Sequence, residues 1–135
     1  MYDNTRPDRY FTEEHQAFRQ NLRAFVEAEI IPNVEAWETA GRLTRDLFRK
    51  AGALGVLGAL YPEDLGGSEG DFFMQVVVGE ELSRCGAGGV CASLGSHSIG
   101  IPPVVKHGSA ALRDTFARPV IAGEKIAALA ITEPG

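Results

Sequence analysis

Apolar residues near the beginning of the chain recur with the spacing of an α-helix. They follow one another at steps of four, three, one and four, with charged and amide side chains between them. The residues on this stripe are Phe18, Leu22, Phe25, Val26 and Ile30. Thr12 precedes them as an N-cap, because its hydroxyl can accept a hydrogen bond from an unpaired amide. Pro32 lacks an N–H group, so the pattern predicts a helix that ends before it.

Similar patterns, separated by glycine and proline, predict further helices along the chain. The predicted segments are 34–39 around Trp37, 44–54 behind Thr44, 72–84 behind Asp71, 90–100, and 109–116 behind Ser109. Pro102 and Pro103 are expected to end or kink the fourth of these, and Pro119 lies beyond the last. The glycine-rich segment 61–71 has no apolar periodicity and is predicted to be a loop.

The character of the chain changes at residues 125–131, a continuous apolar run without a helix cap. Such a run is typical of a buried strand, and a strand needs a neighbour for its backbone hydrogen bonds. We therefore expect an all-α domain, a bundle of helices over residues 1–124. Residues 125–135 are expected to be the first strand of a β domain whose sheet is missing, as if the chain were cut from a longer protein.

Composition narrows the class of protein. The chain has 135 residues, is 44% hydrophobic and carries a net charge of −5, which suits one soluble domain. The chain has no track of basic residues interleaved with aromatic residues, so its sequence does not indicate a nucleic-acid partner. No apolar run approaches the roughly 20 residues of a membrane span, and no signal peptide is recognisable. Cys85 and Cys91 lack metal or redox spacing, so we expect two reduced structural thiols.

The chain offers few candidates for chemistry of its own. The loop at Gly66–Gly70 matches no phosphate-binding motif and is acidic, which favours a tight structural loop over a phosphate cradle. Glu80 and Glu81 are adjacent on a predicted helix and point about 100° apart, so they form no acid–base dyad, and one of them is expected to pair with a basic group. The histidines lack metal spacing, so no metal site is predicted.

The predicted helix over 90–100 is rich in small residues. Either another helix packs closely against it, or it leaves room for an elongated ligand. His97 lies within it, as a core or interface histidine or as one wall of a ligand cavity. No serine or cysteine has the surroundings of a catalytic nucleophile.

Several segments, taken in order, resemble the acyl-CoA dehydrogenase family, and together they span nearly the whole chain. They are EIIP at 29–32, WE at 37–38, KAGALGVLG at 50–58, PEDLGG at 62–67, EELSR at 80–84, HGS at 107–109, AGE at 122–124 after Pro119, and AITEPG at 130–135. The last is the most specific. The segments around Trp37 and His97 are most similar to the long-chain branch.

The resemblance implies a subunit with an N-terminal helical domain, a middle β domain and a C-terminal helical domain, assembled as a tetramer or dimer. It implies FAD as cofactor and an acyl-CoA as substrate, which is converted to a trans-2-enoyl-CoA. A glutamate removes the α-proton, and no residue of this chain matches it, so the 135 residues alone are expected to be inactive. Electrons pass to an electron-transfer flavoprotein, and the location is expected to be cytoplasmic.

The same resemblance assigns two sets of residues. Leu129, Ala130, Ile131 and Thr132 are expected beside the flavin, where backbone N–H groups near Ile131 and Thr132 and the Thr132 hydroxyl would face its pyrimidine edge. Val90, Cys91, Leu94 and Ser98 are expected to line the acyl-chain cavity. Leu94 lies where some family members carry a charged or amide side chain, which favours an apolar tail here.

Two other functions remain open from the sequence. One is a helical interaction module that has lost flavin chemistry. The other is a related flavin enzyme, an acyl-CoA oxidase or a monooxygenase, which would consume oxygen without an added electron acceptor.

Overall fold

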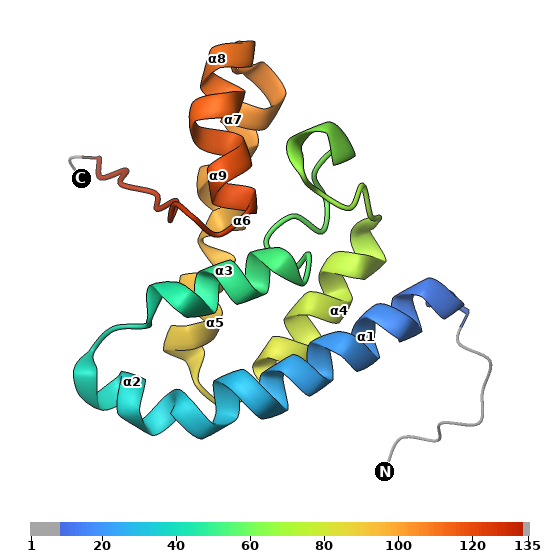
Figure 1. Cartoon of the computed structure of the whole chain (residues 1–135), viewed down its shortest axis with the longest axis vertical. Helices are drawn as coiled ribbons and strands as arrows, with labels where there is room; N and C mark the ends of the chain where they lie inside the picture. The colour runs from blue at the N-terminus through green and yellow to red at the C-terminus, as the bar shows by residue number, and fades with distance from the viewer. Residues whose placement is uncertain (1–8, 134–135) are drawn as a thin grey trace.

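Helices joined by turns and loops make up most of residues 9–133, which are the residues that this computed structural model describes. Figure 1 shows the course of the chain. The α-helices are α1 Glu13–Phe25, α2 Val34–Ala40, α3 Arg45–Ala53, α4 Phe72–Ser83, α5 Gly88–Gly95, α6 His97–Gly100, α7 Pro102–His107, α8 Ala110–Leu112 and α9 Arg118–Ile121. Two π-helical turns, η1 Val26–Ile30 and η4 Arg113–Ala117, and two 3-10 turns, η2 Ile31–Asn33 and η3 Glu63–Leu65, complete them. The all-α prediction is confirmed.

The helix α1 ends before Pro32, as predicted, but the helical path continues through the proline. The wide turn η1 and the tight turn η2 follow α1 directly and carry the helical path on into α2, so that Pro32 lies in the first turn of η2. The amide of Ile31 donates to Val26, five residues back, instead of four. A proline is tolerated here because the regular hydrogen-bond ladder has already been interrupted.

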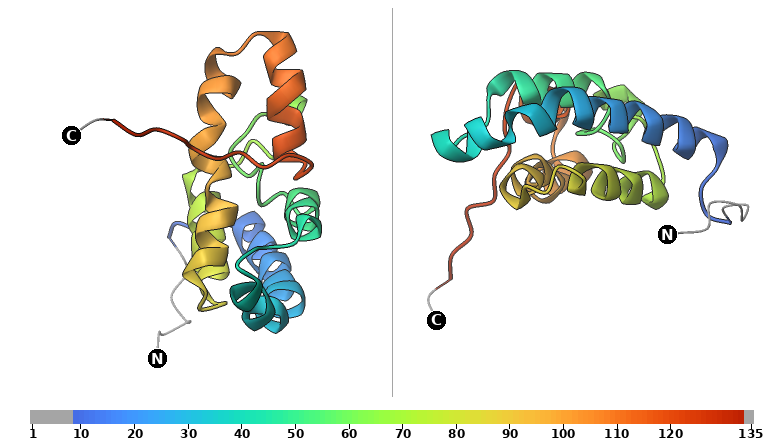
Figure 2. Two further views of the ribbon diagram at one scale, coloured as in Figure 1. Left: turned by 90° about the vertical axis from the view of Figure 1, so that its left-hand side faces the viewer. Right: turned by 90° about the horizontal axis from the view of Figure 1, so that it is seen from below.

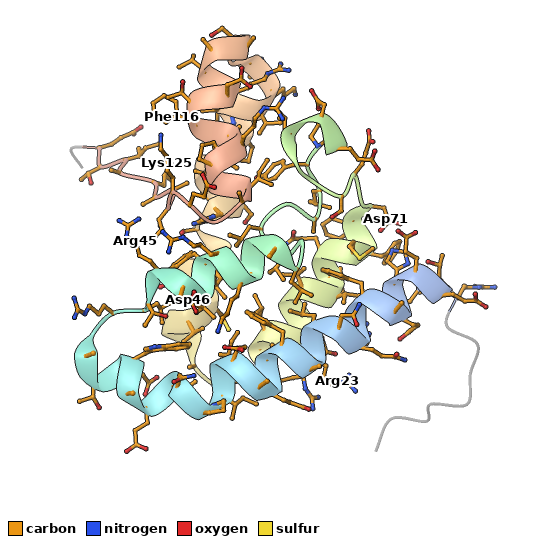
Figure 3. The ribbon with its side chains drawn as sticks, in the orientation of Figure 1. Arg23, Arg45, Asp46, Asp71, Phe116 and Lys125 are labelled. Carbon is orange, nitrogen blue, oxygen red and sulfur yellow. The ribbon has the colours of Figure 1, made fainter. Side chains whose placement is uncertain are left out.

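A π turn also precedes Pro119, which lies beyond the end of the last predicted helix. This turn is η4, and α9 then continues through the proline. Pro119 cannot donate to the carbonyl of Thr115, four residues back. The ammonium of Lys125 donates to this carbonyl instead, at 2.7 Å, and lies 5.2 Å from the centre of the Phe116 ring (Figure 3).

Pro102 starts a new helix, α7, after the preceding helical segment has ended at Gly100, so the end or kink predicted at Pro102 and Pro103 is confirmed. It occupies the first position of α7, where a missing N–H group costs nothing. The segment predicted as one helix over 90–100 is α5 followed by the short α6, and α7 begins immediately after them.

The beginnings of α1 and α4 are held together by side chains. Thr12 caps α1, and the His15 ring accepts a hydrogen bond from the Thr12 amide at 2.9 Å. Asp71 caps α4 by accepting from the amide of Met74. The other His15 nitrogen lies 2.8 Å from Asp71 (Figure 3). The predicted N-caps at Thr12, Asp71 and Ser109 are confirmed, whereas Thr44 has the right position without a side-chain hydrogen bond.

Two apolar clusters form the core. The larger lies among α1, η1, α3, α4 and α5 and includes Leu22, Val26 and Ala51, all fully buried. The smaller joins the loop residue Leu65 to α9 and η4 through Val120 and Ile121. Figure 2 shows the corresponding arrangement, with the hairpin of α7 to α9 beside the main group of helices.

A very close backbone contact connects the two parts. The turn after α9 passes directly over α3, so that a Cβ at Gly123 would lie 1.9 Å from the carbonyl oxygen of Phe48. A Cβ at Gly52 would lie 2.5 Å from the carbonyl of Ala122. Gly123 also has a φ of +73°, which L-residues rarely adopt. Only glycines allow the two backbones to approach this closely.

The predicted strand over 125–131 is not formed. Within residues 9–133 no strand is assigned, and the segment after α9 is extended chain that runs away from the helices (Figures 1 and 2). Its first part is held by Ser96, whose hydroxyl donates to the carbonyl of Ala127 at 3.0 Å. A strand requires a neighbouring strand, and the described helices offer none.

We expect Gly123→Ala to destabilise the protein far more than Gly41→Ala. Both glycines have positive φ, +73° and +63°, but a Cβ at Gly41 would meet nothing within 4 Å. Gly41→Ala should therefore cost only the left-handed conformation, roughly 1–2 kcal/mol. Gly123→Ala should add the collision with Phe48 and lower the free energy of unfolding by about 3 kcal/mol or more. Urea denaturation followed by circular dichroism measures both, and equal losses would contradict the role of this contact.

Candidate functional site: an apolar cleft between α4 and α5

An apolar cleft of about 310 Å³ lies where α4, the segment after α3, and α5 with α6 meet. Aliphatic side chains supply most of its wall, and Gln75, Tyr61, His97 and Ser98 are its polar members. The lining residues are Val56, Leu57, Ala59, Leu60, Tyr61, Gln75, Val78, Leu82, Leu94, Gly95, His97, Ser98 and Pro102. Such a surface suits an apolar ligand or chain with few polar groups.

The structure separates the four residues that the sequence assigned to an acyl cavity. Leu94, which is buried, and Ser98, which is exposed, line this cleft. Val90 lines a different cleft of about 250 Å³ beside Trp37. Cys91 lines neither of the two and lies 4.0 Å from Cys85, sulfur to sulfur. The helical turn of α5 distributes these side chains over different faces.

Tyr61 is a member of the cleft that sequence reasoning missed. It lies between α3 and η3, in a segment without apolar periodicity, so no pattern pointed to it. Its hydroxyl donates to the carbonyl of His97 at 3.4 Å. Burial raises the pKa of Tyr61 to about 12, so the phenol stays protonated at neutral pH.

His97 combines the two alternatives that the sequence left open. Its side chain is 1% exposed and stacks on Phe48, with ring centres 5.4 Å apart and planes 19° apart. It also lines the cleft. Neither ring nitrogen has a hydrogen-bond partner within the described residues. Burial lowers the pKa of His97, and the nearby Val120 carbonyl opposes this only in part, so the ring is neutral at pH 7.

The segment assigned to the flavin lies apart from this cleft. Leu129 and Ile131 are 57% and 70% exposed, and Ala130 and Thr132 are exposed as well. None of the four lines the cleft. Among residues 9–133, the amides of Ile131 and Thr132 have no hydrogen-bond partner. Their donors are therefore free to meet an acceptor supplied from outside the described residues.

The glycine-rich loop is structural, as predicted. The amides of Ser68, Glu69 and Gly70 donate to the carbonyls of Gly58, Tyr61 and Ala59, at 3.0, 2.8 and 2.8 Å. These amides are consequently not available to a phosphate. A Cβ at Gly67 would lie 2.0 Å from the carbonyl oxygen of Tyr61, so glycine is required to close the loop against the segment that forms one wall of the cleft.

A buried carboxylate holds α4 in place against α1. Glu81 is 2% exposed and accepts from Arg23 at 2.7 and 2.9 Å and from Arg19 at 3.2 Å. Arg84 lies 3.4 Å from it. The hydrogen bonds from Arg23 are the main cause that lowers the pKa of Glu81, against the opposing effect of burial. The neighbouring Glu80 is 51% exposed and pairs with Arg19, so both carboxylates have a basic partner, whereas the sequence predicted a partner for only one of them.

Two classes of site find no support in the described part of the chain. No group of three or more His, Cys, Asp or Glu side chains there could hold a metal ion. No described helix has both the length and the apolar composition of a membrane span.

The match to a family model identifies the class of the chain. Residues 12–124 match the model described as "Acyl-CoA dehydrogenase, N-terminal domain". The chain therefore belongs to the acyl-CoA dehydrogenase family, through its N-terminal domain, as the sequence segments indicated.

Individual relatives agree with this assignment. The chain is 39% identical to the mitochondrial long-chain specific acyl-CoA dehydrogenase of Sus scrofa over 127 residues, which are 94% of this chain and 29% of that protein. A Mycobacterium smegmatis crystal structure assigned to the acyl-CoA dehydrogenases matches with 48% identity and a TM-score of 0.88, over 94% of this chain and 34% of the other. A Bacillus anthracis acyl-CoA dehydrogenase complexed with FAD matches with 33% identity and a TM-score of 0.82, over 93% and 22%.

We expect Glu81→Gln to destabilise the protein by about 2 kcal/mol at pH 7, because it removes a buried charge from its arginine partners. Glu80→Gln, the adjacent control, should cost less than about 1 kcal/mol, since the Glu80 carboxylate is half exposed and can be solvated. The lowered pKa of Glu81 means that its stabilisation is present above 4.5, its ordinary value, and is lost as the pH falls through the folded-state pKa. The wild type should thus approach Glu81→Gln in urea denaturation at strongly acidic pH. A constant difference between them at all pH values would refute this account.

Proposed function

We propose that the chain is the N-terminal part of an FAD-dependent acyl-CoA dehydrogenase, with residues 1–124 as its helical domain and 125–135 as the first strand of its middle β domain. The observation that carries the proposal is the apolar cleft between α4 and α5. It is lined by Leu94 and Ser98, two of the residues that the family resemblance assigns to the acyl-chain cavity, and aliphatic side chains dominate its wall. Family membership of residues 12–124 supports the same reaction.

The substrate we propose is an acyl-CoA with an apolar tail that enters the cleft beside Leu94 and Ser98. Leu94 offers no charge or hydrogen-bonding group to the tail, and Ser98 stands exposed on the wall. His97 and Tyr61 are both neutral at pH 7. The tail therefore meets no charge from these four lining residues, which suits a hydrocarbon chain.

The residues at 129–132 fit a flavin because they offer hydrogen-bond donors. The unpaired, exposed amides of Ile131 and Thr132 are donors, and the flavin pyrimidine edge presents acceptors. When bound, FAD supplies the hydride acceptor for the β-hydrogen of the acyl group. The amides of Ile131 and Thr132 would then donate hydrogen bonds to the pyrimidine edge of the flavin, where negative charge develops. The Thr132 hydroxyl would be a further donor.

Other components of the reaction are proposed to lie outside the 135 residues. The chain spans 29% of the Sus scrofa relative and 34% of the Mycobacterium smegmatis structure. We place the glutamate that removes the α-proton in the remainder of the protein. An electron-transfer flavoprotein as acceptor, a homotetramer or homodimer, and a cytoplasmic location complete the proposal.

Anaerobic titration of the complete flavoprotein with a saturated acyl-CoA tests this function. The flavin absorbance near the visible maximum should bleach, and the product should be the trans-2-enoyl-CoA. Rapid oxygen consumption without an added acceptor would instead indicate an oxidase or monooxygenase. A colourless protein that reacts with neither the acyl-CoA nor oxygen would indicate the helical interaction module without flavin chemistry. The 135-residue chain mixed with FAD and substrate should give no turnover, and turnover would contradict the placement of the base.

The cleft itself can be filled by a single substitution. A Cβ at Gly95 meets nothing within 4 Å, and Gly95 lines the cleft. In the complete flavoprotein, Gly95→Leu should lower kcat/KM for a long acyl-CoA about tenfold or more, because several methylenes lose contacts worth about 0.8 kcal/mol each. A short acyl-CoA should be affected much less.

Gly89→Leu is the matched control. Gly89 also has open space at its Cβ position, but it lines the other cleft beside Trp37. The Gly89→Leu variant should prefer long over short acyl-CoAs to the same degree as the wild type. If Gly95→Leu and Gly89→Leu change kcat/KM for long and short acyl-CoAs to the same extent, the acyl tail does not occupy the cleft between α4 and α5.

A further inference from the structure

The thiols of Cys85 and Cys91 form a pair at the junction of α4 and α5. Cys85 follows the end of α4, Cys91 lies in the second turn of α5, and their sulfur atoms are 4.0 Å apart. Both are free and half-buried. They are the only two cysteines among the 135 residues, so any disulfide within this segment must join them.

The segment between the two cysteines has room to move. A disulfide requires the sulfurs to approach to about 2.05 Å. The linker 86–89 contains three glycines, Gly86, Gly88 and Gly89, and a Cβ at any of them would meet nothing within 4 Å. Glycine torsion angles change at little steric cost, although Ala87 within this segment is buried and Gly88 begins α5, so the adjustment is assigned to the glycines.

We propose that Cys85 and Cys91 are a redox modification site, a dithiol that a hydroperoxide converts to a disulfide between α4 and α5. This proposal does not depend on the proposed function, since it rests only on the geometry of the pair.

The reaction takes place in two steps. The sulfur of Cys85 attacks one oxygen of hydrogen peroxide, the O–O bond breaks, and the products are a sulfenic acid at Cys85 and one water. The sulfur of Cys91 then attacks the Cys85 sulfur, the S–S bond forms and the S–O bond breaks, and the hydroxide leaves with the Cys91 proton as a second water. The two thiols lose two electrons and two protons, and the peroxide is reduced to two waters.

The surroundings distinguish the roles of the two cysteines. Burial, and then the proximity of Cys85, raise the pKa of Cys91, and its thiol lies 3.5 Å from the carbonyl of Leu82 as a donor. Cys91 is therefore held as a thiol beside its partner. The contact of Cys85 with the carbonyl of Ala87 is longer, 3.8 Å, so Cys85 is assigned as the attacking sulfur and Cys91 as the one that resolves the sulfenic acid.

The bond would form beside both clefts. Leu82 lies one turn before Cys85 and Leu94 one turn after Cys91, and both line the cleft between α4 and α5. On the other side, Gly89 and Val90 line the second cleft with Trp37, the single tryptophan of the chain. A disulfide would thus fix the separation of two helices that wall the first cleft, and Trp37 would report the change.

Treatment of the 135-residue chain with hydrogen peroxide, followed by mass spectrometry, tests the proposal. Trypsin cleaves after Arg84 and Lys106, so both cysteines fall in one peptide, 85–106, which contains no methionine. This peptide should lose the mass of two hydrogens and regain it with dithiothreitol, and Trp37 fluorescence should change in parallel. An unchanged peptide, a peptide that only gains oxygen, or a disulfide-linked dimer as the main product would each overturn the proposal.

Single variants test the assigned roles. Cys91→Ser should accumulate a sulfenic acid at Cys85 that dimedone traps, and Trp37 fluorescence should then stay unchanged. Cys85→Ser should react with peroxide more slowly than Cys91→Ser, because burial still raises the pKa of the remaining thiol. Faster labelling in Cys85→Ser than in Cys91→Ser would overturn the assignment of Cys85. The wild-type measurement needs no variant and stands if either variant fails to fold.

Discussion

The close contact between α3 and the turn after α9 is the constraint on which the rest of the structure depends. The larger apolar cluster involves α1, η1, α3, α4 and α5, and the smaller one involves η4 and α9. The two backbones meet where Gly52 faces Ala122 and Gly123 faces Phe48, at distances that admit no side chain. Because this turn is fixed, the position at which the extended segment 125–133 begins is fixed as well. The contact therefore connects the core to the residues proposed to approach a flavin.

The cleft depends on a different interaction, the buried charge of Glu81. Apolar packing between α1 and α4 alone allows neighbouring registers, since aliphatic side chains of similar size can exchange places. A buried carboxylate is costly unless its partners are in place. Arg19 and Arg23 on α1 satisfy Glu81 from one side, and the His15–Asp71 pair joins the other ends of the same helices. These polar contacts set the position of the α4 wall, and the aliphatic contacts supply the cohesion.

Local signals in the sequence were sufficient for much of the fold. The apolar stripe of α1 and the caps at Thr12, Asp71 and Ser109 act within a few residues, so they can be read directly. The α-helix α1 ends before Pro32, as predicted, but the helical path continues through Pro32 and through Pro119 by way of π turns that no local sequence pattern indicated.

The candidate site was only partly predictable for the same reason. Leu94 and Ser98 line the cleft, but Tyr61 reaches it from a loop, and the partners of Glu81 lie some sixty residues away along the chain. Such pairs carry no periodic signal. A helix rich in small residues indicates that space is available, whereas the segments that enclose this space are defined only by the tertiary fold.

The two regions assigned to ligands differ in how far they are organised in advance. The walls of the cleft belong to helices held by buried contacts. An apolar chain that enters the cleft therefore requires little further ordering of the protein, and its binding is not weakened by the entropy cost of such ordering. The segment 129–132 is exposed and makes no hydrogen bonds through the amides of Ile131 and Thr132 within the described residues. Donors act on developing charge only when they are held in position. It follows that the surface proposed to bind an acyl chain is intrinsic to these helices, whereas the donors proposed to face a flavin would acquire their geometry from a strand that pairs with the segment.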